Sequence, residues 1–178
     1  MHTFEAPAPG VHRVSADPIE NLVARWEAED TPFVLVDPAG RHARDVLADS
    51  RSHVDLQDSP VHEPAVVDAL LSEHGHAVLD AGAVPERERV GVLGQALIAT
   101  RVSRGWSGSP EWIVVDDAQD LLADPALPPE ALDLSAGGYC LVIRKGASVP
   151  PPVRAWLEQA SEAALASGRP GVQLLEIP

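Results

Sequence analysis

The chain has 178 residues, with 27 Asp and Glu against 13 Lys and Arg, so its formal charge at pH 7 is −14. Apolar residues make up 45% of the chain and charged residues 22%, which is typical of one globular domain and excludes a disordered acidic tail. Because this charge repels phosphate, we expect no direct nucleic-acid binding. An acidic protein that binds partners by mimicking DNA stays open as a function class.

A single cysteine, Cys140, excludes an internal disulfide framework and any zinc site built from several thiolates. The sequence contains no run of 18 or more apolar residues, and its first residues show neither a basic start nor an apolar signal core. We therefore expect a cytoplasmic location and no membrane partner.

Short β-branched runs alternate along the chain with segments of helical period, which is typical of βαβ units around a parallel sheet. Residues 1–10 are expected to be a flexible lead-in, and residues 11–178 a single domain. The pattern predicts strands at Val11–Ser15, Phe33–Val36, Arg51–Leu56, Ala77–Leu79, Trp112–Val115, Tyr139–Ile143 and Val172–Ile177. Since the first and third runs are weak, we expect five or six strands in the sheet.

Helical periodicity follows a candidate N-cap at Asp17 and recurs in three later segments. These segments are Glu63–His74, Glu86–Arg104 and Val153–Ala166. The proline-rich stretches Asp124–Pro129 and Pro150–Pro152 predict loops. The whole predicts an α/β three-layer sandwich around a mainly parallel sheet.

Aspartates directly follow three of the predicted strands: Asp37, Asp80, and the pair Asp116 and Asp117. Ligands of open parallel sheets bind beyond the carboxyl ends of the strands, and carboxylates that converge there could hold Mg²⁺. An Asp at the end of a strand is also a common turn former or helix N-cap, and this alternative stays open.

From Val11 to Ile177 the order of these segments resembles HerA/FtsK-type P-loop ATPases. The turn Asp37-Pro38-Ala39-Gly40 is similar to the DPxG turn of one branch, and Ile113–Gln119 (IVVDDAQ) is similar to the Walker B element. The resemblance implies a P-loop-type strand order with the Walker B strand in the centre. It also implies a metal at Asp116, a catalytic base at Asp117, and cofactor contacts at Asp37 and Gly40.

The phosphate-binding loop of that family is missing. A Walker A loop reads GxxxxGK[ST], because glycine-rich backbone and a lysine hold the phosphates. The segment between the first predicted strand and helix, Ser15–Asn21, reads SADPIEN, so it offers neither glycine nor lysine. Asp17 and Glu20 place negative charge where phosphate would bind. The only lysine, Lys145, lies too far along the chain to supply a displaced loop, so no cofactor is expected, with Mg²⁺ left open.

These observations favour a degenerate, non-hydrolysing ATPase-like domain that acts as an interaction or regulatory module, through self-association or a protein partner. The alternative is an enzyme for Mg²⁺-dependent phosphoryl transfer or phosphate-ester hydrolysis, with Asp116 as metal ligand, Asp117 as base and Asp37 in support. For the interaction module, Trp106 in a flexible turn is the candidate partner-facing residue, although the sequence favours a place in the core even for this tryptophan.

Overall fold

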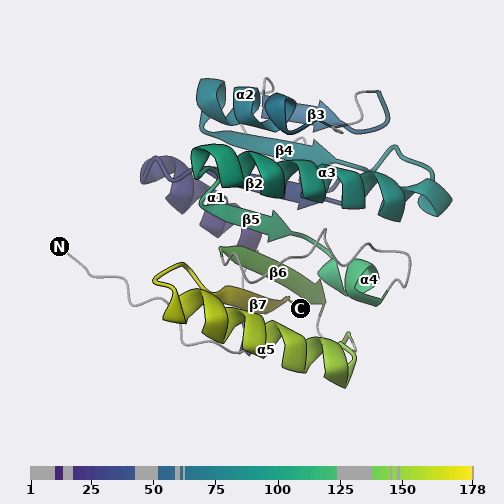
Figure 1. Ribbon diagram of the computed structural model, residues 1–178. Coiled ribbons are helices and arrows are strands. Elements are labelled where there is room, and N and C mark those ends of the chain that lie inside the picture. The colour runs from purple at the N-terminus through teal and green to yellow at the C-terminus, as the bar shows by residue number, and fades with distance from the viewer. Residues whose placement is uncertain are drawn as a thin grey trace.

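The computed structural model describes residues 11–13, 18–42, 52–58, 61, 63–123, 138–144, 146–147 and 149–177. Within these ranges seven parallel strands form one sheet in the order β1-β7-β6-β5-β2-β4-β3 (Figure 1). The strands are β1 (Val11–Arg13), β2 (Phe33–Asp37), β3 (His53–Asp55), β4 (His76–Asp80), β5 (Trp112–Val115), β6 (Tyr139–Arg144) and β7 (Val172–Ile177). The helices are α1 (Pro18–Ala28), α2 (Pro64–His74), α3 (Glu86–Ser107), α4 (Ala118–Ala123) and α5 (Pro151–Ala166).

The α/β class and the parallel sheet are therefore confirmed, while the expected number of strands was too low. The two weakest strand predictions, near residues 11 and 53, correspond to the three-residue edge strands β1 and β3. An edge strand has a neighbour on only one side and needs fewer buried residues, so its apolar run is short. Strand β5 is the middle strand of the sheet.

The sheet is covered on both faces, which makes three layers. Alternate residues of β2 show this: Val34 and Val36 pack in the larger core cluster, and Phe33 and Leu35 pack in the smaller one. The larger cluster includes residues of α2, α3, α4 and α5, which lie on the near face in Figure 1. The smaller cluster includes Ile19, Val23 and Trp26 of α1, which lies behind the sheet. Burial on both faces explains the uninterrupted apolar run of β2.

Most helix ends agree with the predicted ones, and the differences have local causes. Helix α2 ends at Gly75, whose φ of 74° is the left-handed conformation that closes many helices. Pro151 begins α5, although Pro150–Pro152 was predicted as a loop; this was wrong because proline is well tolerated in the first turn of a helix. The short helix α4 was not predicted. Residues 1–10, Asp17 and 124–129 lie outside the described residues.

Candidate functional site

Three aspartates end neighbouring strands at the carboxyl edge of the sheet. Asp37 of β2 pairs with Asp80 of β4, and the pairing of Val36 with Val115 brings Asp116 to the same level on the other side of β2. The chain continues from β2 to β3 on one side and from β5 to β6 on the other, so the strand order reverses here. Ligands of open α/β sheets bind at such a reversal. The structure therefore brings these aspartates together at one edge.

Asp37 and Asp80 shape the turns that follow their strands. The buried Asp37 carboxylate accepts a hydrogen bond from the His42 backbone N–H at 2.6 Å and one from Ala39 N–H at 3.3 Å. Asp80 Oδ1 accepts one from Gly82 N–H at 2.7 Å, and Asp80 Oδ2 lies 3.1 Å from His53 Nε2. These are the contacts of turn-forming aspartates, the alternative left open by the sequence.

The turns after β2 and β4 touch at two glycines. Gly40 has a φ of 68°, and a Cβ atom on it would lie 2.9 Å from Asp80 Oδ1. A Cβ atom on Gly82 would lie 2.8 Å from the Gly40 Cα atom. Close packing of two backbones therefore explains the glycine at position 40, which the sequence analysis treated as a candidate cofactor contact.

Asp116 and Asp117 are bound by cationic and polar side chains of the same chain. Asp116 is fully buried, and its Oδ2 atom accepts a hydrogen bond from Arg41 Nη2 at 2.8 Å and lies 3.0 Å from His42 Nε2. Arg41 Nη2 also contacts Asp117 Oδ2. Arg144 holds Asp117 with two hydrogen bonds, Nε to Oδ1 at 2.9 Å and Nη2 to Oδ2 at 3.1 Å. One guanidinium thus joins both carboxylates, and a second closes over Asp117.

This arrangement keeps both carboxylates charged. Burial alone would raise the pKa of Asp116, but hydrogen bonds from His42 and Arg41 outweigh it and lower the pKa below the ordinary value. The pKa of Asp117 is also lowered, because hydrogen bonds from Arg144 and Arg41 outweigh its burial. We call these two aspartates with Arg41, His42 and Arg144 the Asp–Arg cluster. Two carboxylates and two guanidinium groups leave it without net charge when His42 is neutral.

Backbone geometry and one further side chain fix the position of Asp117. Its φ of 45° lies in the left-handed region, which Asp adopts more readily than most residues. Gln119 Nε2 donates to Asp117 Oδ1 at 3.2 Å, and the Arg144 backbone N–H donates to Gln119 Oε1 at 3.3 Å. Gln119 therefore connects the end of β5 to the end of β6.

The segment expected to match the Walker A loop does not follow a neighbour of β5. Strand β1 lies at the sheet edge, and β7 and β6 separate it from β5. Three strand spacings amount to about 14 Å. The turn that does lie beside the Asp116–Asp117 pair is 37–42, after β2, and it carries Arg41 and no lysine. Residues 15–17 lie outside the described residues.

Sequence reasoning did not identify the partners of the acidic pair. Arg41 and His42 directly follow the DPAG turn, and Arg144 ends β6. The signal that could have revealed Arg41 and His42 is their place in the turn that follows β2, four and five residues after its last residue Asp37, at the same edge of the sheet as Asp116. Within the described parts of the chain, no group of three or more His, Cys, Asp or Glu side chains is arranged to hold a metal ion.

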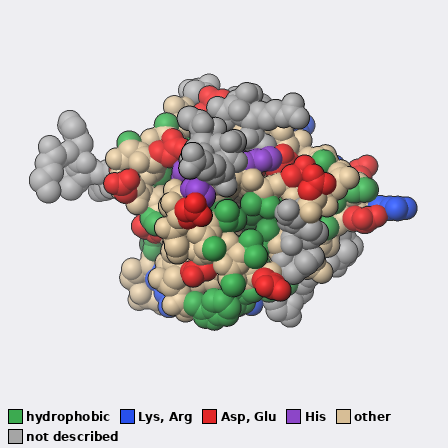
Figure 2. All heavy atoms as spheres, turned by 90° about the horizontal axis from the view of Figure 1, so that it is seen from above, with side chains coloured by type: hydrophobic (Ala, Val, Ile, Leu, Met, Phe, Trp, Pro, Cys, Tyr) green, Lys and Arg blue, Asp and Glu red, His purple; other side chains and the backbone are tan. Residues whose placement is uncertain are grey.

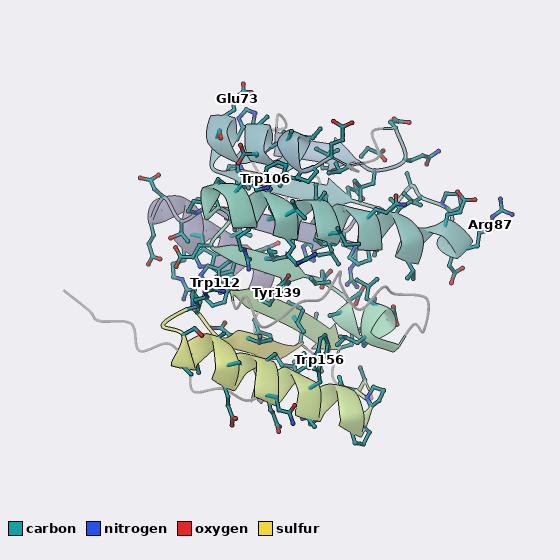
Figure 3. All side chains as sticks on the ribbon, viewed as in Figure 1. Glu73, Arg87, Trp106, Trp112, Tyr139 and Trp156 are labelled. Atoms are coloured by element: carbon teal, nitrogen blue, oxygen red, sulfur yellow. The ribbon has the colours of Figure 1, made fainter. Side chains whose placement is uncertain are left out.

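Trp106 lies in the last turn of α3, whereas a flexible turn was expected. It is 66% exposed, so the favoured place in the core was wrong (Figure 3). The other exposed tryptophan, Trp156 on α5, is 38% exposed.

None of the helices in the described ranges combines the length and the apolar character needed to cross a membrane.

Comparison of the chain with protein-family models, with curated proteins and with solved structures gave no match.

Proposed function

We propose that this chain is a non-hydrolysing domain derived from a HerA/FtsK-type ATPase and acts as a protein-interaction or regulatory module. The observation that carries the proposal is the Asp–Arg cluster. Asp116 and Asp117 match the Walker B-like element, and a divalent cation would approach these carboxylates. Arg41 Nη2 already contacts both of them. The chain's own guanidinium group therefore supplies the positive charge that a bound cation would supply in an active site.

A metal–nucleotide complex would have to displace this guanidinium. Removing one partner from a buried ion pair typically costs about 3–5 kcal/mol, because the remaining charge stays buried and uncompensated. The cost for this pair approaches that range because Asp116 is fully buried. It is reduced because Arg41 is 38% exposed, so water screens its charge. The adjacent turn 37–42 offers one glycine and no lysine to hold phosphates in return.

Titration calorimetry with MgATP tests the proposal on the full chain. We expect no saturable heat and no ATP turnover from the wild type or from Asp116→Asn. Micromolar binding by the wild type that is lost in Asp116→Asn would refute it. Gln173→Ala, in the edge-side strand β7 away from the cluster, serves as a control for handling and folding.

One observation favours the enzymatic alternative. The Asp116 Oδ1 atom is buried and has no hydrogen-bond partner among the described residues, so it could accept a bond from a ligand. A Mg²⁺-dependent phosphatase or phosphotransferase would use this oxygen as a metal ligand, with Asp117 as base. A screen of phosphate esters with Mg²⁺ separates the two functions. Turnover that Asp116→Asn abolishes supports the enzyme, and its absence supports the interaction module.

A further inference from the structure

Trp106 is a large apolar side chain that is exposed to solvent, and it lies in an ordered helix end. Gly108 closes α3 in the left-handed conformation, and its N–H donates to the Arg104 carbonyl at 2.8 Å. The Ser107 hydroxyl donates to the Ser103 carbonyl at 3.1 Å in the same turn. Because the backbone is fixed, partner binding would order little besides the indole ring itself. Exposed tryptophans of this kind are enriched among the residues that dominate binding energy.

Exposed acidic residues lie at the same edge of the sheet as Trp106. Glu111 precedes β5, and its N–H donates to the Pro32 carbonyl at 2.9 Å, which joins it to the turn that contains Asp30. Glu73 lies in the last turn of α2, which packs along α3. Figure 3 labels Glu73 and Trp106 toward one end of the molecule and Arg87 at the other end of α3. We call Trp106, Glu73, Glu111 and Asp30 the amino-edge surface.

Two arginines near this surface are directed onto aromatic rings. The Arg104 guanidinium lies 5.2 Å from the centre of the Tyr139 ring and donates to the Gly138 carbonyl at 3.3 Å. Arg25 lies 5.9 Å from the centre of the Trp26 ring. Arg169 is exposed in the turn before β7, on the other side of β6 from Glu111. Glu73, on the helix that packs against α3, and Glu111, in the turn that follows α3, therefore lie at the same edge of the sheet as the exposed indole.

We propose that the amino-edge surface binds a basic segment of a partner protein, with an Arg or Lys side chain stacked on Trp106 and its basic neighbours facing Glu73 and Glu111. The inference rests on the proposed role as an interaction module. Charge complementarity selects this occupant, because indole is the aromatic ring that binds cations best and the carboxylates add attraction. A second copy would bring a further formal charge of −14, and Figure 2 shows acidic side chains at several points of the visible face.

Fluorescence anisotropy with the full chain tests this inference, using a labelled nine-residue peptide of alternating Arg and Gly as the probe. We expect saturable binding that Trp106→Ala weakens about fivefold. Glu111→Gln and Glu73→Gln should each weaken it about twofold to fivefold. Trp156→Ala, which removes an exposed tryptophan from α5, is the matched control and should leave the affinity unchanged. Circular dichroism confirms that each variant is folded.

Three results would overturn the inference. The first is that the wild type does not bind the peptide. The second is that Trp106→Ala binds the peptide as tightly as the wild type, which would mean that the acidic surface attracts the peptide without a specific site. Sedimentation could instead show a wild-type dimer that Trp106→Ala dissociates, which would make the surface a self-interface. Binding of MgATP would refute the proposed function without changing any of these peptide results, so the two failures are distinguishable.

Discussion

Replacing Arg41 by methionine tests whether the Asp–Arg cluster stabilises the fold. The variant Arg41→Met keeps most of the side-chain volume and removes the guanidinium that contacts Asp116 and Asp117. Hydrogen bonds to charged groups contribute about 1.5–3 kcal/mol each, and the loss is largest where the remaining charge is buried. Asp116 is fully buried but keeps His42 as a partner, and Arg41 is 38% exposed. We therefore expect the free energy of unfolding to fall by about 2 kcal/mol.

Urea unfolding at pH 7 measures this loss, and thermal unfolding should show a Tm lower by about 4–8 °C for a chain of this length. The control is Arg87→Met, because Arg87 is 85% exposed and pairs only with its neighbour Glu88 among the contacts described. Its loss should stay within about 0.5 kcal/mol. If Arg41→Met and Arg87→Met are equally stable, the cluster does not stabilise the fold and the reasoning is refuted.

The pH dependence of the same variant checks the cause. The folded-state pKa values of Asp116 and Asp117 lie below the ordinary value, so both groups bind protons more weakly in the folded state than in the unfolded chain. Their contribution to stability is complete above the unfolded pKa of about 3.9 and is lost as pH falls through the lower folded values. The stability difference between wild type and Arg41→Met should therefore shrink as the pH falls below about 4. A difference that grows on acidification would contradict the charge argument.

Three substitutions test the local geometry beside the cluster. Gly82→Ala should lower the free energy of unfolding by about 1–3 kcal/mol, because its Cβ would meet the Gly40 backbone. Gly91→Ala in α3 has open space around the new methyl group and should raise the free energy of unfolding by up to about 1 kcal/mol. Urea unfolding measures both variants, and a Gly82→Ala variant as stable as the wild type would contradict the close contact with Gly40. Asp117→Asn tolerates the left-handed backbone but loses the charge that Arg144 binds, so its free energy of unfolding should fall by about 1–2 kcal/mol in the same assay. An Asn variant as stable as the wild type would show that backbone shape, and not charge, requires the aspartate.

The buried strands were predictable because burial on two faces demands uninterrupted apolar residues. Strands β2, β5 and β6 each coincide with such a run, and their predicted starts agree with the structure. Their ends were less predictable. Asp37 and Arg144 continue their strands by one residue, because main-chain pairing in a parallel sheet does not require an apolar side chain.

The convergence of Asp37, Asp80 and Asp116 could also be predicted, since the carboxyl ends of parallel strands share one edge. Their partners could not. Arg41 and Asp116 are 75 positions apart, and they meet only because β2 lies next to β5. That neighbour relation results from the path of the whole chain, and no local pattern of residues expresses it. The same limit applies to Ser15–Asn21, the segment expected to match the phosphate-binding loop. Whether this segment lies beside the acidic pair depends on which strand is in the centre of the sheet and which is at its edge, and no local pattern of residues shows that order.

An acidic pair at a strand end can therefore hold a metal ion or be neutralised by cationic side chains of the same chain. The residues that follow the neighbouring strand decide between these two roles. If a glycine-rich, lysine-bearing turn follows that strand, the pair faces a bound anion such as a phosphate. A metal ion between the carboxylates and the anion is then needed to balance their negative charges. Here the turn after β2 carries Arg41 and His42, and both contact Asp116. The carboxylates are then neutralised within the chain, and a metal would have to compete with a tethered guanidinium of fixed geometry. We therefore expect the arginine after the DPAG turn to weaken Mg²⁺ binding by the acidic pair, and Arg41→Met is the variant in which such binding would first become measurable.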